Sequence, residues 1–339
     1  MYIDLDRKIE ALIELGGQIQ HISKEDKLEL FDNVGYANAW FTPENIEKAL
    51  EGLSFMLEKN QLTAWLKQYP TLKSANHGKK VGVIMAGNIP AVGFHDAICV
   101  LLSGNQLYAK LSSTDTILMK WLLNKLIVIE PLFASEIFYV EDLKTIDALI
   151  ATGSDNSSRY FEYYFSKIPH IIRKNRTSLA ILDGNETKED LTNLGKDIFS
   201  YFGMGCRNVS KLLVPKDYDL TLFIEAMFEY KEVLYNRKYA NNYEYNRAIY
   251  LMNQEEFLDN NFLLIKESKE LVSPVGIIYY ARYNSTDELL DTLNENADKL
   301  QCISVRNPKG KEIKFGQTQQ PNIWDYADGV DTLAFLKNI

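Results

Sequence analysis

A cysteine in a glycine-rich turn is the side chain in this sequence best suited to nucleophilic chemistry. Cys206 follows Gly203, Met204 and Gly205 and comes just before an apolar run at 210–215. Glycines let the backbone of such a turn approach a ligand closely, and a cysteine thiolate is a strong nucleophile. Cys206 is therefore the candidate nucleophile.

The other two cysteines lie within apolar runs. Cys99 belongs to AICVLL and Cys302 to QCISV, where a cysteine acts as a small buried hydrophobic residue. Three widely spaced cysteines form neither a disulfide framework nor a Cys-x-x-Cys metal site. Their odd number fits a reducing, cytoplasmic compartment. The four histidines have no metal-ligand spacing, so no metal is expected.

Two further turns follow apolar runs that predict strands. Gly87-Asn88-Ile89-Pro90 follows VGVIMA, and Ala151-Thr152-Gly153-Ser154 ends another run. In open α/β sheets, ligands bind at the carboxyl ends of strands, where a helix begins. The Asn88 amide can donate a hydrogen bond there, or Asn88 only shapes the turn before Pro90. The dinucleotide fingerprint G-x-G-x-x-G is absent.

The elements that position these turns alternate between short apolar runs and helical stretches. The runs lie at 81–86, 106–111, 136–140, 147–152, 178–183 and 210–215, with a second set at 262–266, 275–280 and 301–305 and a helix around 285–294. Unbroken apolar runs are typical of strands buried on both faces, and intervening helices indicate parallel crossovers. The predicted fold is α/β, with two closely packed domains.

The first 80 residues predict helices instead. Apolar residues between Leu5 and Ile13 follow helical spacing, and Gly16 and Gly17 are expected to end that helix. Thr42-Pro43-Glu44 is typical of an N-cap and first turn, and predicts a helix that extends toward Leu66. Farther along, the basic cluster at 173–176 fits an exposed loop or a phosphate contact.

Composition narrows the class of protein. Among 339 residues, 37 are Lys or Arg and 46 are Asp or Glu, so the formal net charge is −9. This balance argues against a nucleic-acid-coating protein, which needs a basic surface. No segment has the roughly 20 apolar residues of a membrane helix, and the N-terminus lacks the pattern of a signal peptide. We therefore expect a cytoplasmic protein without a membrane span.

Several ordered motifs resemble one known family. MAGNIPAVGFHD, AKLSS, ATGSDNSSRYFEYYF, FGMGCRNVSKLLVP and FGQTQQPNIWDYADGVDTLAFL are similar to the LuxC-type acyl-CoA reductases, a branch of the aldehyde dehydrogenase superfamily. The resemblance implies an aldehyde-dehydrogenase-like fold with a Rossmann-like cofactor domain and a smaller α/β catalytic domain. The expected divisions are an N-terminal helical segment (1–80), a cofactor domain (81–185), a catalytic domain (186–310) and a C-terminal docking segment (311–339).

The resemblance also implies roles for individual residues. Cys206 stands at the position of the catalytic cysteine, and Asn88 at that of the asparagine that stabilises the oxyanion. Lys110, Ser112 and Ser113 stand in the segment that contacts the adenine ribose. Ser113 replaces a glutamate there, and the loss of that carboxylate makes NADPH acceptable beside NADH.

The resemblance implies two further cofactor contacts, and the sequence differs from the superfamily pattern at one catalytic position. Gly153 and Ser154 match the pyrophosphate turn, and Glu270 resembles the glutamate that binds the nicotinamide ribose. Ile181 stands where aldehyde-oxidising members carry the glutamate that activates water. Without that base, the acyl enzyme should exchange with a thiol such as coenzyme A rather than hydrolyse, unless Asp183 or Glu186 substitutes for it.

The implied activity is the NAD(P)H-dependent reduction of an acyl thioester to an aldehyde through a thioacyl-Cys206 intermediate. The acyl donor is expected to be acyl-CoA or an acyl-carrier protein. Two alternatives stay open: reduction of an acyl phosphate, and acyl-thioester binding without catalysis. The superfamily usually forms dimers or tetramers, so a homo-oligomer is a further expectation.

Overall fold

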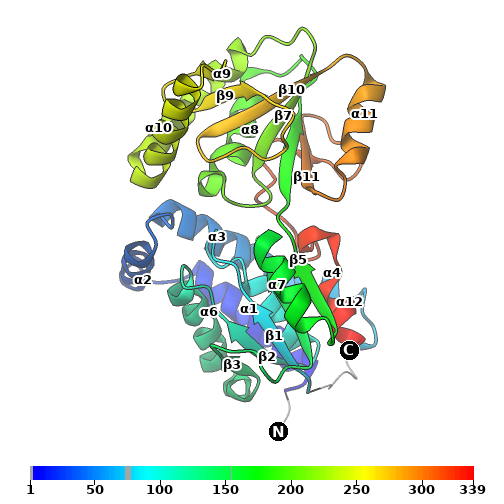
Figure 1. Ribbon diagram of the computed structural model, residues 1–339. Helices are drawn as coiled ribbons and strands as arrows, with labels where there is room; N and C mark the ends of the chain where they lie inside the picture. The colour runs from blue at the N-terminus through cyan, green and yellow to red at the C-terminus, as the bar shows by residue number, and fades with distance from the viewer. Residues whose placement is uncertain (1–2, 73–77, 154) are drawn as a thin grey trace. The chain divides into compact units, whose positions relative to one another are not determined.

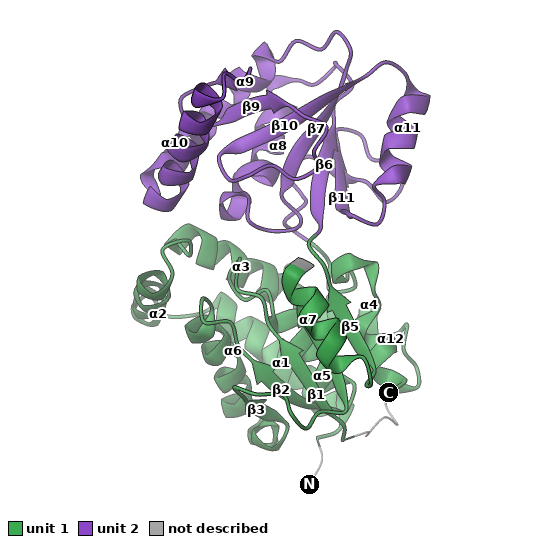
Figure 2. Cartoon of the chain, in the orientation of Figure 1, with its two compact units in different colours: residues 1–175, 321–339 green, residues 176–320 purple. Residues whose placement is uncertain are grey.

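The computed structural model describes residues 3–72, 78–153 and 155–339. The chain divides into two compact units (Figure 2), of which unit 1 comprises residues 1–175 and 321–339 and unit 2 comprises residues 176–320. The expected boundaries at 185 and 310 each lie ten residues from the observed ones. The strand that begins at Thr177 pairs within the second sheet, and this pairing draws the segment 176–185 into unit 2.

Unit 1 contains an open parallel sheet with the strand order β3-β2-β1-β4-β5. Its strands are β1 (Lys80–Ile84), β2 (Gln106–Lys110), β3 (Ile137–Tyr139), β4 (Ala148–Thr152) and β5 (His170–Arg173). The order reverses at β1, so the carboxyl ends of β1 and β4 flank the switch point where such sheets bind ligands. The parallel α/β sheet expected from the apolar runs and the Rossmann-like domain implied by the resemblance are both confirmed.

Alternate residues of these strands face two different layers of helices. Val81 and Val83 belong to the large core that also contains helices α1 (Leu5–Gln20), α5 (Phe94–Leu102) and α6 (Thr116–Ile129). Leu149 and Ala151 face the opposite side, where α7 (Asp155–Phe165) packs. The sheet is therefore covered on both faces, which explains why its strands are continuous apolar runs.

The N-terminal segment is helical, as expected. It forms α1, α2 (Lys24–Ala37), α3 (Pro43–Met56) and α4 (Lys59–Leu66), and the Thr42 side chain accepts the N–H of Asn45 to cap α3. The expectation that Gly16 and Gly17 end the first helix is wrong, because both lie inside α1. A Cβ on Gly16 would lie 2.9 Å from the Cβ of Leu57, so this glycine permits close helix packing instead.

The C-terminal segment 321–339 packs on unit 1 of its own chain. Ile323, Leu333 and Leu336 are fully buried in the unit 1 core, and α12 (Thr332–Lys337) contacts α5. Tyr326 accepts a 2.8 Å hydrogen bond from the indole N–H of Trp65. The expected docking segment therefore begins at 321 rather than 311, because β12 (Ile313–Lys314) still pairs within unit 2.

The basic cluster at 173–176 is not simply an exposed loop. Arg173 ends β5 and is only 3% exposed. Its guanidinium pairs with Asp96 and donates to the hydroxyl of Thr332 at 2.8 Å. Arg173 therefore links a strand, helix α5 and the C-terminal segment within unit 1, and it has no role as a surface contact.

Unit 2 contains a second sheet with the order β12-β11-β6-β7-β10-β9-β8, in which only the pairing of β8 with β9 is antiparallel. Its remaining strands are β6 (Thr177–Ile181), β7 (Val209–Pro215), β8 (Leu258–Asp259), β9 (Leu264–Glu267), β10 (Ile277–Tyr283) and β11 (Leu300–Val305). Its helices are α8 (Lys188–Phe199), α9 (Thr221–Met227), α10 (Arg237–Met252) and α11 (Thr286–Glu295), labelled in Figure 1. A capping box between Thr187 and Asp190 starts α8.

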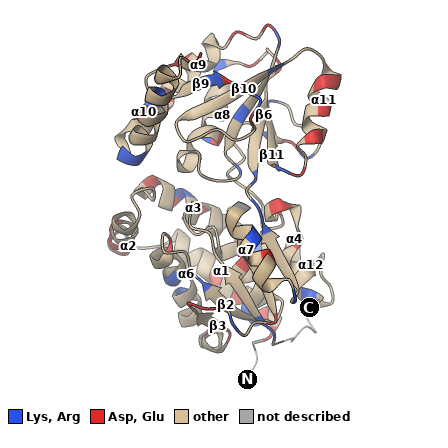
Figure 3. Ribbon diagram, viewed as in Figure 1, with Lys and Arg blue, Asp and Glu red and all other residues tan. Residues whose placement is uncertain are grey.

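The acidic surplus is visible on individual elements. Helix α11 carries Asp287, Glu288, Asp291 and Glu295, and stands out in Figure 3. Within the described ranges, no helix has both the length and the apolar character needed to cross a membrane.

Candidate functional site

The turn after β1 carries Asn88, which is exposed. Thr114 Oγ1 donates a 2.8 Å hydrogen bond to the carbonyl of Gly87. A Cβ on Gly87 would lie 2.3 Å from Thr114 Oγ1 and 2.4 Å from Ser112 Oγ. Only glycine allows this close approach. The structure therefore brings the Asn88 turn against the loop after β2, which carries Ser112 and Ser113.

A buried carboxylate fixes the other side of the Asn88 turn. Asp115 is 3% exposed and accepts the backbone N–H of Ala91 at 2.7 Å. Ala91 has a φ of 57°, a left-handed conformation that is strained for a residue with a Cβ. Burial raises the pKa of Asp115 to about 7, because little solvent reaches the charged form.

A cavity of about 660 Å³ opens beside the carboxyl ends of β1 and β2. Lys110 lines it, together with Ile84, Phe161 and Tyr164. Two further lysines, Lys144 and Lys167, lie on its rim and were not predicted from the sequence, because no motif marks them. Aromatic and apolar walls suit a flat purine ring, and several ammonium groups suit phosphate oxygens.

The glycine of the second predicted turn is also required by packing. Gly153 follows β4, and a Cβ there would lie 2.9 Å from the Cβ of Ser157 and 3.0 Å from Phe161. Because Gly153 has no Cβ, the end of β4 can approach the first turn of α7. Backbone N–H groups and the helix dipole favour an anion there. The predicted partner Ser154 lies outside the described residues.

In unit 2, Cys206 is half-buried and lies on a turn with unusual backbone conformations. Tyr201, Phe202 and Gly203 have φ values of 51°, 56° and 79°. Two consecutive non-glycine residues in this region cost roughly 1–2 kcal/mol each. Such strain persists only where surrounding contacts impose it.

Asn208, which is 2% exposed, makes several of the contacts that hold this turn. Its Oδ1 accepts the N–H of Gly205 at 2.8 Å. Its Nδ2 donates to the carbonyls of Asp197 at 2.9 Å and Ser200 at 2.8 Å. One buried amide therefore joins the end of α8 to the residue before Cys206.

Two more buried side chains hold this region, which we call the Cys206 turn (residues 201–208). Ser178 of β6 donates its hydroxyl to the carbonyl of Cys206 at 2.9 Å. The Asp197 carboxylate accepts the N–H groups of Gly316 at 2.8 Å and Thr318 at 3.1 Å. Arg207 donates in turn to the carbonyl of Thr318 at 2.6 Å. The residues just before the C-terminal segment 321–339 therefore help to hold the Cys206 turn in place.

Glu270 is exposed on the loop between β9 and β10. Its backbone, rather than its carboxylate, is anchored: the ammonium of Lys211 donates to its carbonyl at 3.0 Å. Ser210 donates to the next carbonyl, that of Leu271, at 2.9 Å. Both anchors belong to β7, the strand that follows the Cys206 turn. Unit 2 thus links Cys206 and Glu270 through one strand.

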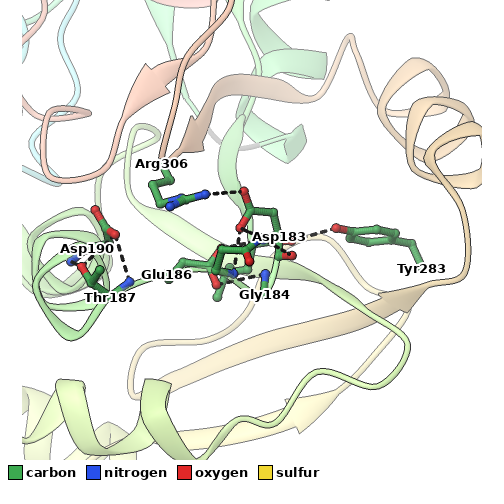
Figure 4. Close-up of polar contacts among 9 residues, drawn as sticks. Asp183, Gly184, Glu186, Thr187, Asp190, Tyr283 and Arg306 are labelled. Carbon is green, nitrogen blue, oxygen red and sulfur yellow. Dashed lines mark hydrogen bonds and ion pairs between the residues drawn. The ribbon is translucent and has the colours of Figure 1, made fainter.

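Asp183 and Glu186 are bound in structural contacts, as Figure 4 shows. Asp183 pairs with Arg306 at 3.1 Å. Glu186 accepts the N–H groups of Asp183 at 2.5 Å and Gly184 at 3.2 Å, and burial raises its pKa. These contacts close the turn between β6 and α8.

The same residues also lie at the wrong end of β6 to assist Cys206. Ser178, near the amino end of β6, contacts Cys206, whereas Ile181 ends the strand. At about 3.3 Å per residue, Asp183 lies on the order of 16 Å along the chain from Ser178. Asp183 and Glu186 follow the carboxyl end of β6, whereas the contact with Cys206 lies near its amino end. Ile181 is three residues from Ser178, about 10 Å along the strand.

The remaining cysteines are core residues, as expected. Cys99 is fully buried in unit 1 and Cys302 is 6% exposed in unit 2. Burial raises the pKa of Cys99 well above its ordinary value, which makes its thiolate unavailable. His95 Nε2 donates a hydrogen bond to the carbonyl of Ile323 at 2.7 Å, and so joins α5 to the C-terminal segment.

Comparison with solved structures defines the class of fold. An aldehyde dehydrogenase of Mycobacterium tuberculosis complexed with NAD+ is 12% identical, with a TM-score of 0.65 over 93% of this chain and 76% of that one. An aldehyde dehydrogenase of Pseudomonas aeruginosa is 12% identical, with a TM-score of 0.66 over 91% of this chain and 73% of that one. An indole-3-acetaldehyde dehydrogenase complexed with NAD+ is 14% identical, with a TM-score of 0.64 over 89% of this chain and 71% of that one. The fold is that of the aldehyde dehydrogenases.

Sequence comparison then assigns the family. The acyl-CoA reductase (LuxC) family matches residues 17–318, and the chain therefore belongs to that family. No curated protein matches the sequence. Family and fold together support chemistry of the acyl-CoA reductase and aldehyde dehydrogenase type.

Proposed function

We propose that the protein reduces an acyl thioester to an aldehyde with a reduced nicotinamide cofactor. The observation that carries this proposal is the Cys206 turn, where a half-buried cysteine follows two residues in strained backbone conformations, Tyr201 and Phe202, and where buried polar side chains hold the turn. Strained backbone of this kind is concentrated at functional sites. The thioester is acyl-CoA, or the same acyl group on an acyl-carrier protein.

In the first half-reaction, the Cys206 sulfur attacks the thioester carbonyl carbon. A tetrahedral oxyanion forms, its carbon–sulfur bond to coenzyme A breaks, and the released thiolate takes up a proton. Asn88 is proposed to stabilise the oxyanion with its amide N–H.

The second half-reaction needs a nicotinamide cofactor, and the residues of unit 1 fit one. Solved relatives of this fold are complexed with NAD+. The cavity beside Lys110 suits the adenosine, the turn at Gly153 suits the pyrophosphate, and Glu270 is proposed to bind the nicotinamide ribose. When bound, the cofactor supplies a hydride to the thioacyl carbon, and the aldehyde is then released as the Cys206 sulfur departs.

The proposed cofactor is NADPH, with NADH as the weaker alternative. Ser112 and Ser113 offer hydroxyls rather than a carboxylate in the loop after β2. Lys110, Lys144 and Lys167 surround the cavity, where Asp142 is the one carboxylate among the residues that line it. Lys144 pairs with Asp142, and the two further ammonium groups, those of Lys110 and Lys167, favour a ligand with an additional phosphate.

The surroundings of Cys206 favour thiol exchange over hydrolysis. At the amino end of β6, which contacts the Cys206 turn, the side chains are Arg176, Thr177 and Ser178, and none is a carboxylate. A water molecule near the acyl enzyme therefore lacks a base from this strand. We propose that the acyl enzyme persists until hydride arrives or a thiol removes the acyl group.

The test is a comparison of acyl donors with the purified full-length protein. We expect NADPH oxidation with one or more acyl-CoA esters in a panel of chain lengths, together with a trapped aldehyde product. An acyl phosphate is expected to give little reaction. Reduction of the acyl phosphate alone would replace this proposal with the acyl-phosphate alternative, and nicotinamide binding without any reduction would favour a non-catalytic role.

A further inference from the structure

Lys211 is a buried lysine in the apolar run that forms β7. It is 4% exposed. Its Nζ donates to the carbonyls of Ser268, Lys269 and Glu270, each at 3.0 Å. Three consecutive carbonyl oxygens therefore surround one ammonium group, in the loop that carries the candidate ribose-binding residue Glu270.

The geometry excludes a direct chemical role for this lysine. A protonated lysine has three N–H donors and no acceptor, and all three are taken by the loop carbonyls. A neutral amine would offer only two donors and would leave one carbonyl unpaired. Burial lowers the pKa of Lys211, while the nearby Glu270 carboxylate opposes that change. The contacts require the charged form.

Packing alone does not explain a charge at this position. A buried ammonium loses hydration worth several kcal/mol, and an apolar side chain of similar volume is often equally stable. Neighbouring contacts point to the loop as the reason. Ser210 donates to the carbonyl of Leu271 at 2.9 Å and lies 2.6 Å from the hydroxyl of Thr177 on β6. Two adjacent residues of β7 therefore hold four consecutive loop carbonyls.

The position of these anchors ties the loop to the nucleophile. Lys211 follows Cys206 by five residues and lies near the start of β7, the strand that follows the Cys206 turn. Ser178, next to Thr177, holds the carbonyl of Cys206. The amino ends of β6 and β7 thus position both the Cys206 turn and the Glu270 loop, residues 268–271.

We propose that Lys211 is a positioning residue that fixes the Glu270 loop in the conformation that binds the nicotinamide cofactor, without taking part in acylation of Cys206. The inference rests on the proposed function for the role of the loop. The contacts themselves predict the loop's stability whether or not that function holds.

The test compares Lys211→Met, which removes the donors, with Lys211→Arg, which restores several of them. Lys216→Met is the matched control, because Lys216 is exposed beyond the far end of β7. In Lys211→Met we expect the dissociation constant for NADPH, measured by fluorescence titration, to rise at least tenfold. The rate of Cys206 acylation by acyl-CoA, measured by mass spectrometry without cofactor, should change less than twofold. Lys211→Arg should recover cofactor affinity to within about threefold of the unmodified chain.

Hydrogen exchange separates failure of this inference from failure of the proposed function. In the full chain without ligand, Lys211→Met should raise amide exchange of a peptide spanning 268–272 at least tenfold, with little change around Cys206. Unchanged exchange there would overturn the inference. Equal losses in acylation and cofactor binding would also overturn it, since they would mean a general structural role.

A second variant covers the case in which Lys211→Met does not fold. Ser210→Ala removes one hydroxyl from the same loop and should change exchange and NADPH affinity in the same direction by about two- to threefold. If Ser210→Ala alters neither the exchange of the loop peptide nor the affinity for NADPH, the proposal is wrong.

Discussion

The two units place their candidate functional residues at opposite ends of parallel strands. In unit 1, Asn88, Ser112 and Gly153 follow the carboxyl ends of β1, β2 and β4. In unit 2, Cys206 precedes β7 and contacts the amino end of β6. Carboxyl ends offer helix N-termini that bind anions without special side chains, whereas amino ends do not. The nucleophile must therefore be held by buried polar groups.

This difference predicts how substitutions in each unit should affect the protein. Unit 1 is proposed to bind its ligand through glycines that permit close approach and through lysines around an open cavity. Unit 2 depends on single buried side chains, of which Asn208, Asp197 and Lys211 each make three or more hydrogen bonds. Substitutions that disturb the Cys206 turn should therefore act on chemistry and stability, whereas substitutions in unit 1 or in the contacts of the Glu270 loop should act mainly on ligand affinity.

The largest expected effect is that of Cys206→Ala. Removing the sulfur removes the covalent intermediate, and we expect thioester reduction to fall by at least about 10³-fold. Cofactor binding should persist within about twofold, because the substitution leaves the proposed cofactor contacts in place. Cys302→Ala, also in unit 2, is the control and should retain activity. A Cys206→Ala protein with substantial NADPH-dependent reduction would remove the basis of the proposed chemistry.

Asn208→Ala should act on both stability and chemistry. It leaves the N–H of Gly205 and the carbonyls at the end of α8 without their partner, which should lower the free energy of unfolding by about 2–3 kcal/mol. Acylation of Cys206 should slow more than tenfold, because the strained turn relaxes. Urea denaturation and acyl-adduct formation measure the two effects, with exposed Asn185→Ala as control. If Asn208→Ala lowers the free energy of unfolding but Cys206 is acylated at the normal rate, the strained turn is not needed for acylation.

Asp115→Asn should change how stability depends on pH. The folded pKa of Asp115 is about 7, whereas its ordinary value in an unfolded chain is near 3.8. Between these values the folded protein holds a proton that the unfolded chain has lost, so stability falls as pH rises from about 4 to about 7. Asparagine removes this titration. Near pH 8 the free energy of unfolding of Asp115→Asn should therefore be about 1–2 kcal/mol higher than that of the unmodified chain. If the free energy of unfolding depends on pH in the same way in Asp115→Asn and in the unmodified chain, the raised pKa of Asp115 is contradicted.

The smallest expected effects concern the cavity lysines. Lys144→Met and Lys167→Met should each raise the KM for NADPH about threefold to fivefold, since each removes roughly 1 kcal/mol of attraction at an exposed site. The KM for NADH should change less than twofold. Lys125→Met, on α6 and outside the cavity lining, is the control. Equal effects on both cofactors would mean that these lysines do not meet the additional phosphate.

Much of the fold could be predicted because buried parallel strands are continuous apolar runs. Strand β5 was missed, since it begins with His170 and ends with Arg173. Arg173 is buried only because Asp96, far away in the sequence, neutralises it. The end of the cofactor domain was placed too late for a related reason: the run at 178–183 resembles the strands before it, and only pairing with β7 and β11 assigns it to unit 2.

The candidate site shows the same division. Cys206, Asn88 and Gly153 lie in motifs at strand ends and could be selected from the sequence. Lys144 and Lys167 could not, because a cavity formed by separate segments brings them together. Lys211 did carry a signal, since a lysine inside the apolar run SKLLVP must find partners when the strand is buried.

The central claim is that Cys206 carries the acyl group, and mass spectrometry of the intact protein tests it most directly. The full chain is mixed with a panel of acyl-CoA esters without reductant and then digested. We predict an acyl mass added to the peptide that contains Cys206, none on Cys99 or Cys302, and loss of the adduct when NADPH is added. Failure of every ester to acylate Cys206, or acylation of another residue in its place, would contradict the account.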